Sequence, residues 1–194
     1  MKTLKVVIVS GVPGVGKSTV INGALRMVKD KADVQLVTYG DIMEEIATKR
    51  GLVKNRDEMR KLPAKVQRTV QKRAAEQIAK MSKKQLVVVD THTLILTPEG
   101  LLIGLPRWVV ESIRPSSLVL IEADPRKIAG RRAKDKTRSR DEQDPKGIDT
   151  HQQMCRAAAV AVGTLTGATV KIIRNKEGKA EEAAGIFAEL LLKV

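Results

Sequence analysis

The segment from Gly11 to Ser18 limits the fold of this chain more than any other stretch. It reads GVPGVGKS and matches the pattern G-x-x-x-x-G-K-[ST] at every fixed position. A β-branched apolar run, residues 5–10, precedes it, and residues 19–29 follow with apolar side chains at helical spacing. A loop in this context turns backbone N–H groups toward an anion, and the helix adds a positive N-terminal field. The segment therefore predicts a phosphate-binding loop (P-loop).

Short apolar runs that alternate with helical patterns predict an α/β fold. The expected architecture is a five-stranded parallel sheet with helices on both faces, because such runs suit strands buried on both sides. A small hairpin is expected at residues 93–103, where a Pro-Glu-Gly turn joins two apolar runs. The order of the strands cannot be read from the pattern. The strands are expected at residues 5–10, 34–39, 86–89, 118–122 and 169–173, and the helices at 19–29, 41–51, 57–82 with a break near Pro63, 106–114, from 125 onward, 149–166 and 179–193.

Polar residues follow four of the predicted strands. Gly11, Asp41, Asp90 and Asp124 all lie where a strand ends, and ligands of parallel sheets bind at the carboxyl ends of the strands. Within the P-loop, Lys17 is expected to reach the β- and γ-phosphates, and the Ser18 hydroxyl to bind Mg²⁺. Asp90, at the end of the third predicted strand, is expected to be the second protein ligand of the metal.

The composition is that of a basic globular chain. It has 194 residues, 42% of them hydrophobic, with 36 Lys+Arg against 22 Asp+Glu and a net charge of +14. Such an excess favours anionic partners, although charge alone does not choose between nucleotides and nucleic acids. Eight basic residues and a single acid, Asp135, lie between Arg126 and Arg140. One cysteine, Cys155, with no signal peptide and no apolar span, predicts a protein of the reducing cytoplasm.

Several segments resemble archaeal adenylate kinases, from the first predicted strand to the last. Besides the P-loop, the similar segments are YGD at residues 39–41, RDEMRKL at 56–62, VVVDTHT at 87–93, TPEGLLIGLP at 97–106, DKTRSR at 135–140 and TGATVKIIRN at 166–175. The resemblance implies a P-loop kinase fold and transfer of phosphate from ATP to AMP with Mg²⁺. It also implies a cytoplasmic enzyme, with ADP as product and a homotrimer in at least some members.

By this resemblance the chain is a single domain, residues 1–194, with two specialised segments. Residues 40–84 form a helical segment for the nucleoside monophosphate, and residues 126–148 form a mobile basic lid. The implied ATP-binding residues are Gly11, Val12, Pro13, Gly14, Val15, Gly16, Lys17, Ser18 and Thr19, and the implied catalytic residues are Lys17, Arg131, Arg138 and Arg140. The implied AMP-binding residues are Gly40, Asp41, Arg56, Arg60, Thr91 and His92, and the metal ligands are Ser18 and Asp90.

One departure concerns the AMP phosphate. Bacterial-type adenylate kinases carry an AMP-binding arginine soon after the segment that corresponds to residues 39–41, but here residues 41–45 are acidic. Arg56 or Arg60 is therefore expected to bind this phosphate. His92 is equally compatible with contacting AMP and with a purely structural role. We interpret Trp108, His151 and Cys155 as packing residues.

Two other functions remain open on the residues alone. A kinase for another nucleoside monophosphate would share this pattern, because base choice rests on a few hydrogen bonds. An RNA-associated ATPase acting in assembly would suit the positive charge, although aromatic residues for stacking bases are nearly absent. A GTP-binding switch is disfavoured, because Gly178 stands where the guanine-reading acid would be expected. The Ala-rich segment 149–166 is expected either to pack on the sheet or to form a contact between subunits.

Overall fold

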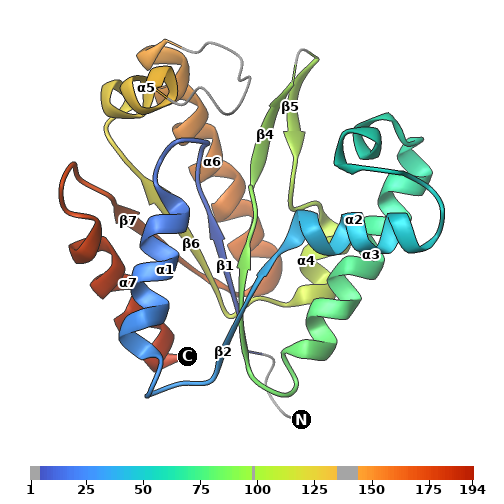
Figure 1. The fold of residues 1–194 in the computed structure, drawn as a ribbon, viewed down its shortest axis with the longest axis horizontal. Coiled ribbons are helices and arrows are strands. Elements are labelled where there is room, and N and C mark those ends of the chain that lie inside the picture. The colour runs from blue at the N-terminus through green and yellow to red at the C-terminus, as the bar shows by residue number, and fades with distance from the viewer. Residues whose placement is uncertain (1–4, 98, 135–143) are drawn as a thin grey trace.

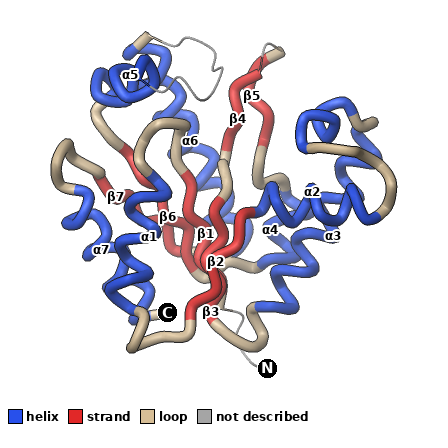
Figure 2. Tube along the Cα trace, viewed as in Figure 1, coloured by secondary structure: helices blue, strands red, loops and turns tan. Residues whose placement is uncertain are grey.

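The computed structural model describes residues 5–97, 99–134 and 144–194, and its centre is a five-stranded parallel sheet (Figures 1 and 2). The strands run in the order β2-β3-β1-β6-β7. The P-loop thus follows the central strand. The strands are β1 (Val6–Ser10), β2 (Val34–Thr38), β3 (Leu86–Asp90), β6 (Ser117–Glu122) and β7 (Thr169–Arg174). The predicted α/β class and all five strands are confirmed.

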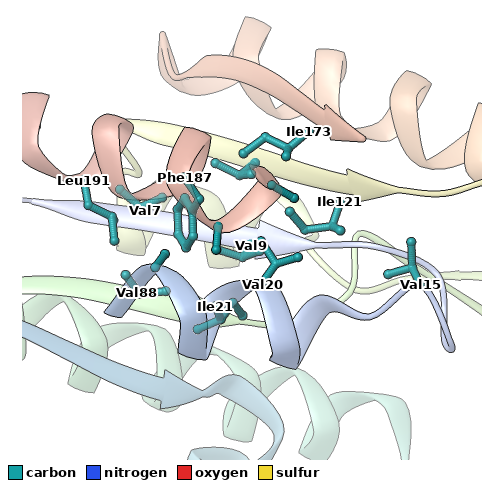
Figure 3. Close-up of a cluster of buried hydrophobic side chains, with 14 of the residues drawn as sticks. Val7, Val9, Val15, Val20, Ile21, Val88, Ile121, Ile173, Phe187 and Leu191 are labelled. Carbon is teal, nitrogen blue, oxygen red and sulfur yellow. The ribbon is translucent and has the colours of Figure 1, made fainter. Parts of the chain in front are cut away.

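Helices cover both faces of this sheet. The structure places α1 (Lys17–Val28) and α7 (Ala180–Lys193) on one face, and α3 (Ala64–Met81), α4 (Arg107–Ile113) and α6 (Pro145–Thr166) contribute to the core of the other. Figure 3 shows Phe187 and Leu191 of α7 close to Val7 and Val9 of β1. Val6 and Ile8 face the opposite core, which accounts for a strand with no polar residue before Ser10.

Three segments extend from the carboxyl ends of the strands. A helical arm consists of α2 (Tyr39–Lys49), the 3₁₀ helix Arg56–Lys61 and α3. The strands β4 (Leu94–Thr97) and β5 (Gly100–Ile103) form the predicted antiparallel hairpin. The third segment is α5 (Pro125–Lys134). In the view of Figure 1, the hairpin stands between α5 and the arm. No helix in the described part of the chain is both long and apolar enough to cross a membrane.

Several predicted boundaries move. The helix α2 begins at Tyr39, two residues before the predicted start at residue 41, so that Thr38 is its N-cap and Asp41 lies in its first turn. The helix α6 begins at Pro145, four residues before the predicted start, because the Asp144 side chain accepts a hydrogen bond from Gly147 N at 2.7 Å. Asp124 caps the start of α5, since its Oδ1 accepts bonds from Arg126 N at 2.8 Å and Lys127 N at 3.2 Å.

Candidate active site

The P-loop joins β1 to α1 at the carboxyl end of the central strand of the sheet. Gly14 and Gly16 have φ values of 85° and 88°, a region that L-residues with a Cβ rarely adopt. Gly16 is also the N-cap of α1, and no side chain caps this end of the helix. Val12 and Val15 point into the core and are only 2% and 1% exposed. The loop is thus anchored by its valines, while its glycines permit a backbone conformation that can surround an anion.

Lys17 and Asp90 form an ion pair beneath this loop. The Lys17 ammonium also donates to Thr91 O at 2.8 Å. Both side chains are mostly buried, with 11% and 20% of their surfaces exposed. Burial lowers the pKa of Lys17 from its ordinary value, and the Asp90 carboxylate opposes part of this shift. The structure therefore brings together the two residues that were assigned separately from the P-loop pattern and from the end of β3.

His92 contacts the P-loop from the β3–β4 connection. Its Nδ1 lies 2.9 Å from Gly11 O, and because a carbonyl only accepts, this nitrogen carries the proton. Burial and the nearby Lys17 charge lower the pKa of His92 to about 4, so the ring is neutral near pH 7. The connection is fixed further by Ser10, whose Oγ accepts from Thr93 N at 2.7 Å. His92 therefore has a structural contact with the P-loop, and a contact with AMP remains a prediction.

Two arginines of α5 lie against the P-loop carbonyl groups. Arg131 donates from Nη1 to Val15 O at 3.2 Å and from Nη2 to Glu177 at 2.5 Å. Arg132 donates from Nε to Pro13 O at 2.8 Å. The basic residues at the end of α5 are therefore attached to the outer side of the loop, close to the β7–α7 connection.

Gln71 of α3 joins the two long helices of the arm to each other and to α4. The Tyr39 hydroxyl donates to Gln71 O at 2.7 Å, and Trp108 Nε1 donates to Gln71 Oε1 at 3.1 Å. Burial raises the pKa of Tyr39, so its hydroxyl remains a donor at neutral pH. The Arg68 guanidinium lies 4.4 Å from the centre of the Trp108 ring. Trp108 thus packs between α4 and α3, in agreement with its interpretation as a packing residue.

Comparison with known proteins identifies the family of this chain. An AAA domain model matches residues 10–149. Proteins named adenylate kinase from Methanothermobacter thermautotrophicus and Methanopyrus kandleri are 48% and 51% identical over 188 and 186 residues. These alignments cover 97% and 95% of this chain and 100% and 96% of the relatives. The relative from Pyrococcus furiosus is 48% identical over 96% of this chain and 94% of its own length.

The chain belongs to the adenylate kinase family.

Solved structures agree with the fold at much lower sequence identity. A shikimate kinase from Acinetobacter baumannii, solved in complex with shikimate, is 15% identical, covers 99% of this chain and 95% of its own, and superposes with a TM-score of 0.56. The likeness shows that this adenylate kinase family member has the fold of small P-loop kinases.

The structure locates the predicted residues of this adenylate kinase family member unevenly. Residues 11–19 lie in the P-loop and the first turn of α1, and Gly40 and Asp41 lie in the first turn of α2. Arg56 and Arg60 belong to the 3₁₀ helix of the arm, where only the backbone is described. Arg138 and Arg140 lie outside the described residues, as does residue 135. The structure brings Lys17, Asp90, Thr91, His92 and Arg131 to one place around the P-loop.

Several contacts of this adenylate kinase site were missed by the sequence reasoning. Asn175 donates from Nδ2 to Val15 O at 2.8 Å, although the sequence predicted no role in the site for it. Glu122 at the end of β6 receives two bonds from Arg156, at 2.7 and 2.5 Å. The one available signal was the position of Asn175 directly after a predicted strand. Polar residues that follow the other strands were assigned to the ligand site for this reason.

Proposed function

We propose that this chain transfers the γ-phosphoryl group of ATP to AMP, reversibly and with Mg²⁺, and so forms two ADP. The observation that carries the proposal is the Lys17–Asp90 ion pair beneath the P-loop, at the end of the central sheet strands. It joins a cation for phosphate and a carboxylate for metal in one partly buried place. The adenylate kinase names of relatives that are 48% and 51% identical over nearly the whole chain support the same activity.

The P-loop and Lys17 supply the ATP side. Backbone N–H groups of residues 14–18 and the N-terminus of α1 would bind the phosphate oxygens. Lys17 would exchange its bonds to Asp90 and Thr91 for bonds to the β- and γ-phosphates. This exchange keeps the ammonium in a low-dielectric place, where its attraction for the charge of the transferring group is large.

The chemistry of the side chains fits Mg²⁺. Ser18 and Asp90 offer the hard oxygen ligands that this ion prefers. Asp90 is paired with Lys17, which directly precedes Ser18 in the chain. Within residues 5–97, 99–134 and 144–194 no group of three or more His, Cys, Asp or Glu side chains could hold a metal. Mg²⁺ usually has only one or two protein ligands and completes its coordination with water and phosphate oxygens. When bound, the ion would neutralise charge on the phosphates.

The arm would supply the AMP side. Gly40 and Asp41 follow β2, next to β3 in the sheet, and Thr91 and His92 follow β3 itself. These residues would line the place of the nucleotide, with Thr91 and His92 close to Lys17. We assign the AMP phosphate to Arg56 or Arg60, because the first turns of α2 carry acids and no arginine.

The arginines at and after the end of α5 would complete the site. Arg131 already contacts Val15 O, so a change of its rotamer would direct the guanidinium toward phosphate. The assignment of Arg138 and Arg140 rests on the sequence. Planar guanidinium groups can bind the oxygens of the transferring phosphoryl group in pairs, which a lysine cannot do. Covering the site would also exclude water, which would otherwise accept the phosphate.

A coupled assay across nucleotides tests the function. Purified chain, Mg²⁺ and ATP are mixed with AMP, CMP, UMP or GMP, and ADP formation is followed with each. We expect the highest kcat/KM with AMP. A higher value with CMP or UMP would contradict the adenylate assignment. ATP consumption that no monophosphate accelerates, but that RNA accelerates, would favour the RNA-associated ATPase.

The assembly and location of the protein stay predictions. On the exposed side of α6, Met154, Val160 and Leu165 are 43%, 60% and 53% exposed. Ala157 and Ala161 are exposed there as well, whereas Ala159 packs on the sheet. We propose that this face contacts further copies of the chain in a homotrimer, and light scattering at micromolar concentration measures the mass. A monomer mass would contradict the trimer. The cytoplasmic location stays a prediction from the cysteine content and the family resemblance.

A further inference from the structure

The carbonyl groups of the P-loop need partners on the side away from the phosphate. A loop that turns its N–H groups inward directs carbonyls outward, and buried carbonyls without partners are costly. Here three loop carbonyls accept bonds from side chains of three separate segments. Gly11 O faces His92 Nδ1 at 2.9 Å, Pro13 O accepts from Arg132 at 2.8 Å, and Val15 O accepts from Asn175 at 2.8 Å and Arg131 at 3.2 Å.

Asn175 is the most deeply buried of these donors. Its exposed fraction is 4%, whereas the Arg131 side chain is 30% exposed. The backbone N–H of Asn175 donates to Glu122 O at 2.7 Å, which continues the pairing of β7 with β6. The Glu122 carboxylate is itself bonded twice by Arg156 of α6. The position of Asn175 is therefore fixed by its backbone bond to β6, at the carboxyl end of the sheet.

The bond from Asn175 fixes a peptide plane of the phosphate site. Val15 C=O and Gly16 N–H belong to one planar peptide group and point in opposite directions. A donor that holds the oxygen thus also fixes the direction of the Gly16 N–H. Gly16 has a φ of 88° and a Cβ there would lie 2.4 Å from Asn175 Nδ2, so the side-chain amide occupies the space that only a glycine leaves free.

We propose that Asn175 is a positioning residue for ATP, which holds the Val15–Gly16 peptide so that its N–H is directed at phosphate before the nucleotide binds. The inference rests on the proposed function, because it concerns the same site. Arg131 shares the Val15 carbonyl, but it also pairs with Glu177 and is assigned to the phosphates. Once Arg131 turns toward ATP, Asn175 is left as the side-chain donor to this carbonyl.

The test replaces the donor and measures ATP binding directly. Asn175→Asp keeps the size of the side chain but removes the N–H and places a carboxylate against the carbonyl; Asn175→Ala removes the donor without adding charge. For each variant, calorimetry with a non-hydrolysable ATP analogue gives Kd, and steady-state kinetics give kcat and both KM values. We expect Kd for the analogue to rise roughly five- to a hundredfold in both, as for the loss of a partner to a buried carbonyl. The KM for AMP should change by less than about twofold from the wild-type value, because free-energy changes at separate sites are independent.

A matched control separates positioning from general stability. Gln152 is another buried amide, also 4% exposed, and it bonds the backbone of Ala123 but makes no bond to the P-loop. Gln152→Glu should lower the melting temperature as Asn175→Asp does, and leave Kd for the analogue near that of the wild type. A purely structural role of Asn175 would change the kinetic constants for both nucleotides alike, or change only the melting temperature.

The outcomes also distinguish this inference from the proposed function. Unchanged analogue binding in Asn175→Asp and Asn175→Ala, or equal losses for ATP and AMP, overturns the positioning role. Failure of both variants to fold makes Asn175 a folding residue and overturns it as well. If the wild type binds the analogue but transfers no phosphate to any monophosphate, the proposed function is wrong, whereas a loss of binding in the Asn175 variants would still support the positioning role.

Discussion

The P-loop and the helical arm would bind the two substrates, and the fold holds them by different means. The P-loop follows the central strand, its valines belong to a main core cluster, and donors from three segments bind its carbonyls. The inner ends of α2 and α3 belong to the second core of the sheet, whereas the outer part of the arm has only a small cluster of its own, in which the buried residues are Ala47, Val53 and Val70. The connection from α2 to α3 contains only the short 3₁₀ helix.

This contrast fits a kinase that fixes one substrate and adapts to the other. Phosphate recognition by backbone N–H groups requires a loop that is in place before binding, because every misdirected donor lowers the stabilisation of developing charge. Recognition of the acceptor and exclusion of water require segments that can move against the sheet. A segment with few buried contacts of its own opens at low cost in free energy.

The largest effect is expected in the P-loop itself. Lys17→Met should lower kcat by roughly 100- to 1,000-fold or more, because it removes a preorganised cation from the phosphates. The fold should persist, since Lys17 lies beyond the carboxyl end of the central strand and outside the apolar core. Coupled kinetics and a thermal melt measure the two effects, and Lys29→Met, at the exposed C-terminal end of α1, is the control. A variant with nearly normal kcat would remove the P-loop from the catalytic site.

The next effect concerns the basic segment that follows α5. Arg138→Ala and Arg140→Ala should each lower kcat by roughly ten- to a thousandfold, in the range for single donors to a transition state, while ATP binding alone changes much less. Arg→Lys variants should recover only part of the rate, because a point charge lacks the planar fork. Lys127→Ala, an exposed cation of α5, serves as the control. Wild-type kcat in both alanine variants would show that this run is only a solvated charged loop.

A smaller and more selective effect is expected in the arm. Arg60→Ala or Arg56→Ala should raise the KM for AMP by roughly ten- to a hundredfold, the range for losing a hydrogen bond to a charged group. The KM for ATP should change less, because the P-loop does not depend on the arm. Steady-state kinetics with each nucleotide varied in turn, with Lys61→Ala as control, give both constants. Equal changes for the two nucleotides in both variants would refute a role confined to AMP.

The smallest change compares the two cores directly. Val20→Ala in the main core and Val53→Ala in the arm each remove the same two methyl groups from a buried site, worth about 2 kcal/mol. We expect Val20→Ala to lower the melting temperature of the whole chain. Val53→Ala should lower it less and should raise the KM for AMP, because it loosens only the arm. If both variants lose the same global stability and neither changes this KM, the arm and the sheet are one cooperative unit.

Much of the fold was predictable because its signals are local. The strand β1 is wholly apolar and runs into the P-loop, and the pattern of Asp124 and Pro125 fixed the start of α5. The strand order was not predictable, since it depends on which buried runs pair across long distances. The start of α6 was misplaced because residues 145–148 lack a clear apolar period, whereas the cap at Asp144 decides the start of the helix.

The residues of the candidate site also differ in whether a local sequence signal predicts them. Lys17, Ser18 and Asp90 could be found because strand ends and the P-loop pattern carry the signal in sequence. The bracing contacts could not be found, since Val15 and Asn175 are 160 residues apart and their bond follows from the pairing of β7 with β6. The position of Arg131 also depends on Glu177 in the β7–α7 connection, and no local pattern of α5 predicts that partner.

The stoichiometry of phosphate transfer distinguishes an adenylate kinase from an ATPase. The purified chain is incubated with Mg²⁺, ATP and AMP, and phosphorus NMR follows all phosphate species to equilibrium, with Lys17→Met as the inactive control. We expect that each AMP consumed yields two ADP, with no inorganic phosphate released, and that ADP alone returns to ATP and AMP. Release of inorganic phosphate from ATP at a rate independent of AMP, with AMP left unchanged, would contradict the proposed function.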